Sequence, residues 1–290
     1  MQEFQIHEPR SVQEASALLA QYGWESTLYA GGTELLLLMR EGLTHFPHLI
    51  NVKNIAGLDG IRLDDSGEAL RIGAAATHHA LERSGLIAAY APLLAEVEAL
   101  VGNIRVRVTG TIGGNLCFAE PRSDLAALFS AWPGASYELN STRGSRRVPA
   151  ADFNTDLFLT VREDDEIMTA IRLPVLASDV GYAYEKFAFL ERPSANVAAF
   201  LTLNQGQIRA ARVVVGSVGP APFAAVQAAE ILRGQRAAPA LFEAAADAAA
   251  AAADPVDDIY GTAEYKRQLV RVLARRALHR AATRAKGDGS

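Results

Sequence analysis

The sequence predicts an α+β protein built from two domains, or from three small ones. The first third alternates short strand-like and helix-like segments, and the last third carries two long strand-like runs followed by alanine-rich helices. The chain has 290 residues, of which 50% are hydrophobic and 21% charged. This balance is typical of folded proteins and not of disordered ones. We therefore expect the chain to bury real hydrophobic cores.

The N-terminal segments form a compact βαβ-type unit. Ser11-Val12-Gln13-Glu14 is a capping box, which predicts a helix that ends at Gly23. A strand then leads into Gly31-Gly32-Thr33, and Gly42 ends the helix that follows. The expected elements are strands at 4–6, 27–30 and 49–52 and helices at 12–23 and 34–41.

The middle of the chain begins a second unit after Asn54. Thr77 is an N-cap candidate, and Pro92 favours the first turn of another helix. Residues 102–115 are rich in glycine and β-branched side chains, so we expect little helix there. The expected elements are a strand at 70–74, helices at 77–83, 92–101 and 125–132, and mainly strands and turns over 136–173.

The last third has a different composition. It predicts strands within 182–203 and 207–216 and helices at 222–232, 241–253 and 263–284. Nine of the ten residues from Ala244 to Ala253 are alanine. This run indicates a closely packed helix more readily than a functional segment.

Charge and cysteine content exclude several classes of function. Lys and Arg number 28 and Asp and Glu 33, a net charge of −5, so a nucleic-acid partner is not expected. Cys117 is the single cysteine, which excludes an internal disulfide, a cysteine-rich zinc site and an iron–sulfur cluster held by this chain alone. The N-terminus lacks a signal-peptide pattern, and no stretch reaches the roughly 20 apolar residues of a membrane span. We expect a cytoplasmic protein.

Two glycine loops carry the candidate chemistry. Ala30-Gly31-Gly32-Thr33-Glu34 lies between a strand and a helix, where backbone N–H groups can hold a phosphate. Thr111-Ile112-Gly113-Gly114-Asn115 combines a hydroxyl, two glycines and a carboxamide, with Asp124 nine residues after Asn115. The alternatives are an ordinary strand-to-helix turn for the first loop and a β-bulge or hairpin turn for the second. Neither a standard dinucleotide fingerprint nor a P-loop motif occurs.

Three groups of motifs resemble one family. They are Ala30–Leu35, the stretch from Arg107 to Leu125 that contains Gly110–Leu116 and Pro121–Leu125, and the pair Tyr184–Phe187 and Arg192–Ala198. Together they look like the FAD-binding medium subunit of molybdenum hydroxylases, such as carbon monoxide dehydrogenase and the flavin domain of xanthine dehydrogenase. The resemblance continues through 214–216, 230–234 and 265–278, so it covers nearly the whole chain.

The resemblance implies a fold. Residues 1–176 would form a two-subdomain FAD-binding domain of the vanillyl-alcohol-oxidase-like (PCMH) type, with subdomains at about 1–54 and 55–176. Residues 177–290 would form a smaller α+β domain like the C-terminal domain of the carbon monoxide dehydrogenase flavoprotein.

The resemblance also implies FAD as the cofactor and names its contacts, with no catalytic residue and no metal ligand on this chain. Asp124 would hold the ribose hydroxyls, Met168 would pack on the flavin, and Lys186 would lie near the ring. Val101 takes a place near the flavin where the xanthine enzymes have an aromatic residue. The two pyrophosphate loops would be Leu28, Tyr29, Ala30, Gly31, Gly32, Thr33, Glu34 and Leu35, and Thr111, Ile112, Gly113, Gly114 and Asn115. One departure is Arg107-Val108-Thr109, where many relatives carry Arg-Asn-Arg.

The implied function is electron transfer. An iron–sulfur small subunit and a molybdenum large subunit would be the partners, in a dimer of heterotrimers, and FAD would pass the electrons to a terminal acceptor. A rival hypothesis is a stand-alone FAD-dependent reductase like the enolpyruvyl-glucosamine reductases, although residues 184–198 do not match that family. A third is a scaffold that has lost its flavin, which the retained loop glycines disfavour.

Several single residues have simpler alternatives. Asp124 could be a helix N-cap, and Lys186 could be a solvated lysine on a strand. His78 and His79 are adjacent, so on a helix they do not share a face as metal ligands, and we expect surface or cap residues. Cys117 is expected to be an inert buried thiol.

Overall fold

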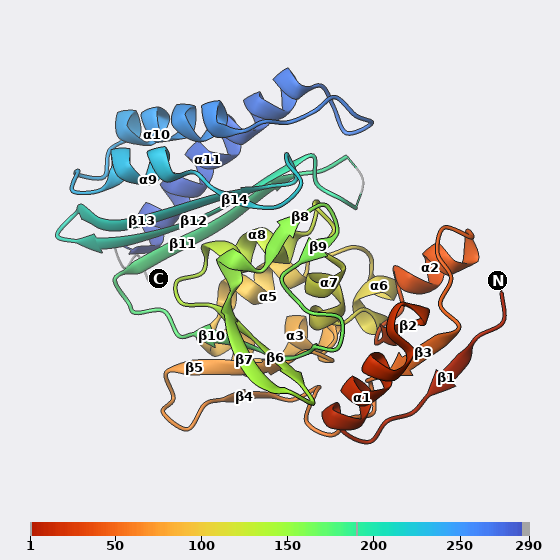
Figure 1. The fold of residues 1–290 in the computed structure, drawn as a ribbon. Coiled ribbons are helices and arrows are strands. Elements are labelled where there is room, and N and C mark those ends of the chain that lie inside the picture. The colour runs from red at the N-terminus through yellow and green to blue at the C-terminus, as the bar shows by residue number, and fades with distance from the viewer. Residues whose placement is uncertain (1, 190, 286–290) are drawn as a thin grey trace. The chain divides into compact units, whose positions relative to one another are not determined.

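The computed structural model describes residues 2–189 and 191–285 and has the expected α+β content (Figure 1). It divides into two compact units. Unit 1 contains the residues up to 118, 134–153 and 160–175, and unit 2 contains 119–133, 154–159 and the residues from 176 onward. Segment 119–133 belongs to unit 2 because its helix packs on strands of that unit.

Unit 1 begins with a parallel three-stranded sheet in the order β1-β3-β2. The Ser11 hydroxyl caps the first helix by accepting from the Glu14 N–H, as the capping box predicts. The Glu14 carboxylate, however, accepts from the Arg10 N–H at 2.8 Å. The elements are β1 (Gln5–His7), α1 (Val12–Tyr22), the 3₁₀ turn η1 (Gly23–Glu25), β2 (Ser26–Tyr29), α2 (Leu35–Arg40) and β3 (His48–Asn51).

A second sheet of unit 1 has five antiparallel strands in the order β4-β5-β10-β6-β7. Its strands are β4 (Ile61–Leu63), β5 (Ala69–Gly73), β6 (Ser136–Ser141), β7 (Gly144–Pro149) and β10 (Ile167–Pro174). Between β7 and β10 lie η2 (Ala150–Asp152), β8 (Asn154–Asp156) and β9 (Leu159–Thr160).

The expectation of little helix over 102–115 is wrong. The Asn103 side chain caps α6 by accepting from the Arg105 and Val106 N–H groups, and Gly110 ends that helix in an extended conformation. The Thr111 hydroxyl then accepts from the Gly114 N–H in the first turn of α7. Local capping therefore outweighs the low helix propensity. The helices of this part are α3 (His78–Arg83), α4 (Gly85–Tyr90), α5 (Pro92–Glu98), α6 (Ile104–Thr109) and α7 (Ile112–Phe118).

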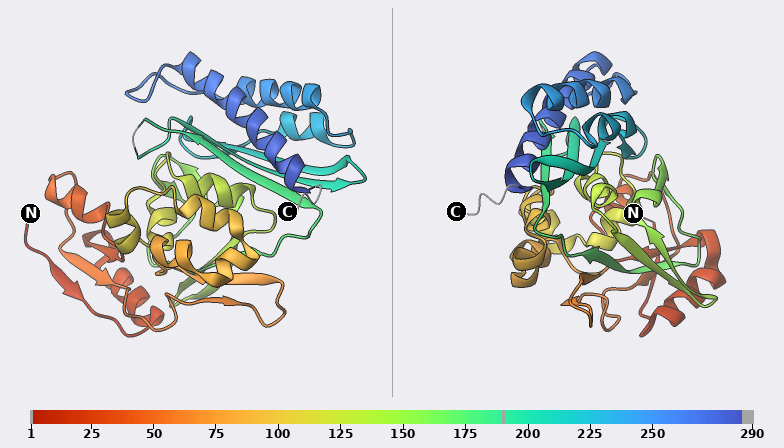
Figure 2. Two further views of the ribbon diagram at one scale, coloured as in Figure 1. Left: turned by 180° about the vertical axis from the view of Figure 1, so that it is seen from behind. Right: turned by 90° about the vertical axis from the view of Figure 1, so that its left-hand side faces the viewer.

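Unit 2 is an antiparallel four-stranded sheet with helices on both faces. Helices α9, α10 and α11 cover one face and α8 lies on the other (Figures 1 and 2). Its elements are α8 (Asp124–Ala131), β11 (Val180–Phe187), β12 (Ala195–Asn204), β13 (Gln207–Gly216), β14 (Phe223–Ala224), α9 (Val226–Leu232), α10 (Pro239–Ala252) and α11 (Ala263–Ala285).

The alanine run lies in the core of unit 2. Ala245, Ala246 and Ala249 of α10 are fully buried in one cluster with Ala274 and Ala277 of α11. Small side chains let the two helices approach closely, so the packing interpretation is confirmed. Of the described helices, none combines the length and the apolar composition that a bilayer crossing requires.

Candidate functional site

The first glycine loop presents unused backbone donors. Strand β2 ends at Tyr29, residues 30–34 form the turn, and α2 begins at Leu35. Gly32 has φ +73°, and a Cβ there would lie 2.6 Å from the Tyr29 ring, so glycine is required. Within the described chain, the N–H groups of Gly31, Gly32 and Thr33 form no hydrogen bond. Successive free amides of this kind suit a phosphate.

The second loop is the first turn of α7. Its Ile112 N–H donates to Ala76 O at 2.9 Å, and its Gly113 N–H donates to Ala74 O at 2.8 Å. Those two amides are therefore used inside the protein, where they hold the loop to the segment after β5. Gly114 is exposed and Asn115 is half-buried, so these two residues are the parts of this loop that can still meet a ligand. Thr111 is 3% exposed, and its hydroxyl accepts from the Gly114 N–H.

The backbone of the first loop touches the backbone just before the second loop. A Cβ on Gly31 would collide with Thr109 O and would lie 2.7 Å from the Gly110 Cα. On Gly113, a Cβ would lie 2.6 Å from the Ala74 Cβ. These two glycines are thus required by close packing inside the protein.

His78 is buried, which corrects the expectation of a surface or cap residue. It is 2% exposed at the start of α3, and its Nδ1 lies 2.7 Å from Glu98 Oε2 at the end of α5. Helix α3 packs against α5, which places the ring inside unit 1. His79 fits the expectation, because its side chain is 44% exposed.

The two residues of unit 1 that were expected near the flavin are both buried. Val101 follows α5 and is 7% exposed, and Met168 on β10 is 4% exposed, beside a shift in register between β10 and β6. Arg107 is anchored internally, since its Nε donates to Glu82 Oε2 at 3.0 Å and its guanidinium also donates to Val101 O at 3.2 Å. Val108, where many relatives carry asparagine, is exposed.

Asp124, Tyr184 and Lys186 form a buried cluster in unit 2. The Tyr184 hydroxyl donates to Asp124 Oδ1 at 2.5 Å, and Lys186 Nζ donates to Oδ2 at 3.0 Å. Burial first, and then the Asp124 carboxylate, hold the pKa of the Tyr184 phenol well above its ordinary value. The Lys186 side chain is only 14% exposed and is paired with Asp124, so Lys186 is not a solvated lysine.

Asp124 is not the N-cap of α8. Ser123 caps that helix with its hydroxyl, which accepts from the Ala126 N–H. Tyr184, which we did not predict as a site residue, lies two positions before Lys186 on β11, so both side chains point to the same face of the strand. That spacing was the available signal for Tyr184. The pairing of His78 with Glu98 has no comparable local signal, since twenty residues separate them.

The Cys117 thiol is in an environment that disfavours its ionised form. Desolvation by burial raises its pKa to about 11, and a thiol that stays protonated is a poor nucleophile. The raised pKa agrees with the expected inert thiol, although the residue is half-buried and not fully buried.

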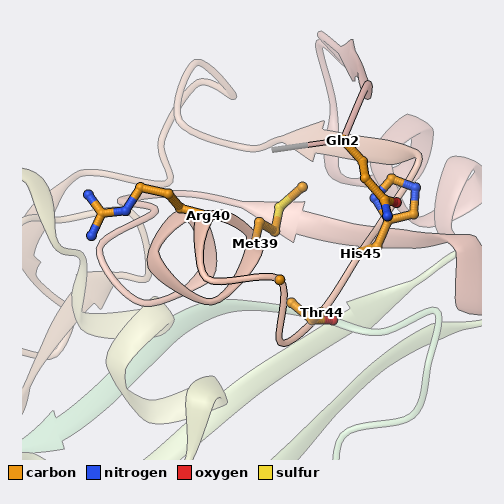
Figure 3. A pocket seen from close by; sticks show the side chains of 6 residues that line it. Gln2, Met39, Arg40, Thr44 and His45 are labelled. Atoms are coloured by element: carbon orange, nitrogen blue, oxygen red, sulfur yellow. The ribbon is translucent and has the colours of Figure 1, made fainter.

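A separate pocket of about 250 Å³ lies at the end of α2, lined by Gln2, Met39, Arg40, Gly42, Thr44 and His45. The Arg40 side chain points away from Gln2 and His45 (Figure 3). No candidate cofactor residue lines this pocket, so it does not define the site.

Comparison with known proteins identifies the family. Residues 2–176 match the family described as FAD binding domain in molybdopterin dehydrogenase, and residues 192–281 match the carbon monoxide dehydrogenase flavoprotein C-terminal domain. The chain is 37% identical to the carbon monoxide dehydrogenase medium chain of Afipia carboxidovorans, over 98% of both chains. It belongs to the FAD-binding medium-subunit family of the molybdenum hydroxylases.

Solved structures agree with this family. Carbon monoxide dehydrogenase from Hydrogenophaga pseudoflava matches with a TM-score of 0.94 at 35% identity, covering 98% of both chains. Quinoline 2-oxidoreductase from Pseudomonas putida 86 matches with a TM-score of 0.92 at 27% identity, also over 98% of both chains. The fold class expected from the sequence, a FAD-binding domain followed by a C-terminal domain, is confirmed.

FAD is the cofactor of this family, and the residues of this chain fit it. The first loop has three consecutive backbone amides, those of residues 31–33, that form no hydrogen bond within the described part of the chain. The chain is thus an oxidoreductase flavoprotein subunit, and its relatives are medium subunits of multi-subunit enzymes.

Proposed function

We propose that this chain is the FAD-binding electron-transfer subunit of a heteromeric molybdenum hydroxylase, which passes electrons from iron–sulfur clusters on a partner to a terminal acceptor. The observation that carries the proposal is the match to the family over both of its domains, combined with the open amides of the first loop. Bound FAD would supply the redox chemistry, since a flavin takes up electrons singly and releases them in pairs.

Different residues would hold different parts of FAD. Residues 28–35 would bind the pyrophosphate mainly through the N–H groups of 31–33, and residues 111–115 would contribute from their accessible side, at Gly114 and Asn115. Asp124 would accept from the ribose hydroxyls, in an orientation fixed by Tyr184 and Lys186. Val101 and Met168 would supply apolar surface for the ring system, and Lys186 would add positive charge near it.

The partners in this proposal are an iron–sulfur small subunit and a molybdenum large subunit, in a dimer of heterotrimers. The single cysteine supports it, because a cluster is typically held by about four thiolates and these must come from another chain. A cytoplasmic location is part of the same proposal.

The test is purification from the native source. We expect two other polypeptides to co-purify with the chain, one with iron and one with molybdenum, and mild denaturation to release FAD without a covalent link. A chain that purifies alone and colourless, and that takes up no FAD on reconstitution, would overturn the proposal.

A further inference from the structure

We propose that the buried His78–Glu98 pair is a positioning device for the cofactor, which sets the separation of the two glycine loops; this rests on the proposed function. The side chains of His78 and Glu98 are 3% and 0% exposed. His78 Nδ1 and Glu98 Oε2 form a hydrogen bond of 2.7 Å. The hydrogen bond fixes the rotation of the imidazole.

The fixed ring supports the start of the second loop. Its Cδ2 and Nε2 lie 3.2 and 3.5 Å from the point where a Cβ of Gly110 would be. The backbone N–H of His78 also donates to Gly110 O at 3.1 Å. One residue therefore holds Gly110 both by packing and by a hydrogen bond.

Gly110 in turn supports the first loop. A Cβ on Gly31 would lie 2.7 Å from the Gly110 Cα, so the two backbones are in direct contact. The contacts from the His78 ring to Gly31 pass only through the backbone of Gly110, so no flexible side chain lies between them. Since packed backbone transmits displacement with little loss, the position of the ring determines how far apart the loops lie. A pyrophosphate held by both loops is sensitive to that distance.

The most informative variant is His78→Asn. Its amide can donate to Glu98 from about the place of Nδ1, but it lacks the ring atoms that contact Gly110. We expect at least about tenfold weaker FAD binding by the full-length apoprotein, with a changed visible circular dichroism of the bound flavin.

A second variant separates positioning from folding. His78→Leu combined with Glu98→Leu replaces both buried polar partners with apolar ones, which is often neutral for stability. We expect this protein to fold and still to bind FAD at least about tenfold more weakly than the parent, because nothing orients the side chain under Gly110.

Two controls match these variants. Ser16→Ala removes another buried polar contact of unit 1, in which the hydroxyl donates to Asp165 O at 2.8 Å and accepts from the Thr142 N–H at 2.9 Å. It should lower the thermal midpoint of the apoprotein and leave the FAD dissociation constant unchanged. His79→Asn, on the same helix as His78, should change neither quantity.

The outcomes are distinct. If the parent binds FAD and both His78 variants bind it with parent affinity and an unchanged circular dichroism, the positioning role is overturned and the proposed function stands. If Ser16→Ala weakens FAD binding as much as His78→Asn does, general destabilisation is the cause and the inference also fails. A parent that binds no FAD would overturn both proposals.

Discussion

The Asp124 carboxylate accepts hydrogen bonds from two side chains of strand β11. Substitution of either donor should therefore have a measurable effect. The Tyr184 hydroxyl and the Lys186 ammonium each bond one carboxylate oxygen of Asp124. A hydrogen bond to a charged group is worth more than a neutral one, and its loss leaves a buried charge less well compensated.

Tyr184→Phe should lower the stability of the apoprotein by about 2 kcal/mol, because it removes a buried hydrogen bond to a carboxylate without creating a cavity. The shift of the midpoint in urea unfolding measures it. Tyr182→Phe, on the same strand, is the control. An unchanged midpoint in Tyr184→Phe would show that the phenol does not stabilise Asp124.

Lys186→Met should make bound FAD harder to reduce, because a cation near the flavin favours its anionic reduced form. A downward shift on the order of 30 mV, about 1.4 kcal/mol for a two-electron couple, is expected in a redox titration. In Lys186→Met the negative charge of Asp124 is left without its lysine partner. Adding Asp124→Asn removes that negative charge, so the potential should move back toward the parent value. An unchanged potential in Lys186→Met with FAD fully bound would contradict the role of the lysine.

The roles of Asp124 and Lys186 as site residues could be predicted only from the family resemblance. The contact between their side chains could not be predicted from the sequence. The spacing of Tyr184 and Lys186 on a strand puts them on one face. No sequence pattern predicts that α8 brings Asp124 to that face. His78 was misjudged for the same reason, since its burial depends on α5 and not on its own helix.

The elements that carry the loops also allow a test. Gly114 lies on the exposed side of α7, and a Cβ there would meet only the Thr111 hydroxyl, at 2.9 Å. Alanine is the better helix former by roughly 0.5–1 kcal/mol. The Thr111 hydroxyl must shift to make room for the methyl group, which weakens the cap of α7. Because these two effects oppose each other, Gly114→Ala should fold with a stability within about 1 kcal/mol of the parent. Binding of FAD should weaken about tenfold, because the methyl group obstructs the approach of the ligand.

Isothermal titration of apoprotein with FAD measures the Gly114→Ala effect. Gly113→Ala is the contrasting variant, since its methyl group would press on Ala74 and destabilise the protein even without FAD. Parent affinity in Gly114→Ala would mean that this loop is only a turn.

The N-terminal sheet should be sensitive to pH. His7 Nε2 and His48 Nδ1 lie 3.1 Å apart, and the Tyr22 ring stacks on His48. Desolvation, and then His48, lower the pKa of His7 below its ordinary value of 6.5. The unfolded chain therefore binds more protons as the pH falls through 6.5 toward the lowered pKa, and stability is lost over that range.

The expected loss at the histidine pair is below about 1 kcal/mol, because the pair is partly exposed. His7→Gln should show a smaller decrease in the urea midpoint between about pH 7.5 and pH 5.5 than the parent does. An equal decrease in both proteins would place the pH sensitivity elsewhere.

Elements with strong local signals were predictable. The capping residues Ser11 and Thr77 and the strands at 27–30 and 207–216 lie where the pattern places them. Helices α6 and α7 were missed, because the glycine and β-branched residues of this stretch have low helix propensity. The capping side chains of Asn103 and Thr111 stabilise these helices all the same. Composition describes average propensity, whereas a single side-chain cap can decide a six-residue helix.

For the whole molecule, the sequence predicted the fold class through family motifs that lie far apart in the chain. It could not show that segment 119–133 packs with the C-terminal residues, since this depends on contacts of α8 with β12 and β13. The single cysteine already required that iron–sulfur clusters, if used, belong to a partner. We therefore expect the chain to hold FAD and to depend on other subunits for the oxidation of substrate.

Anaerobic reduction of the FAD-loaded chain tests that dependence most directly. The purified chain is reconstituted with FAD, and carbon monoxide, purines, aldehydes and aromatic acyl thioesters are added in turn while the flavin absorbance is followed. We expect no bleaching by any substrate without partner subunits, and full bleaching when dithionite is added as the control. Rapid reduction by one of these substrates alone would contradict this expectation and would favour a stand-alone flavoenzyme.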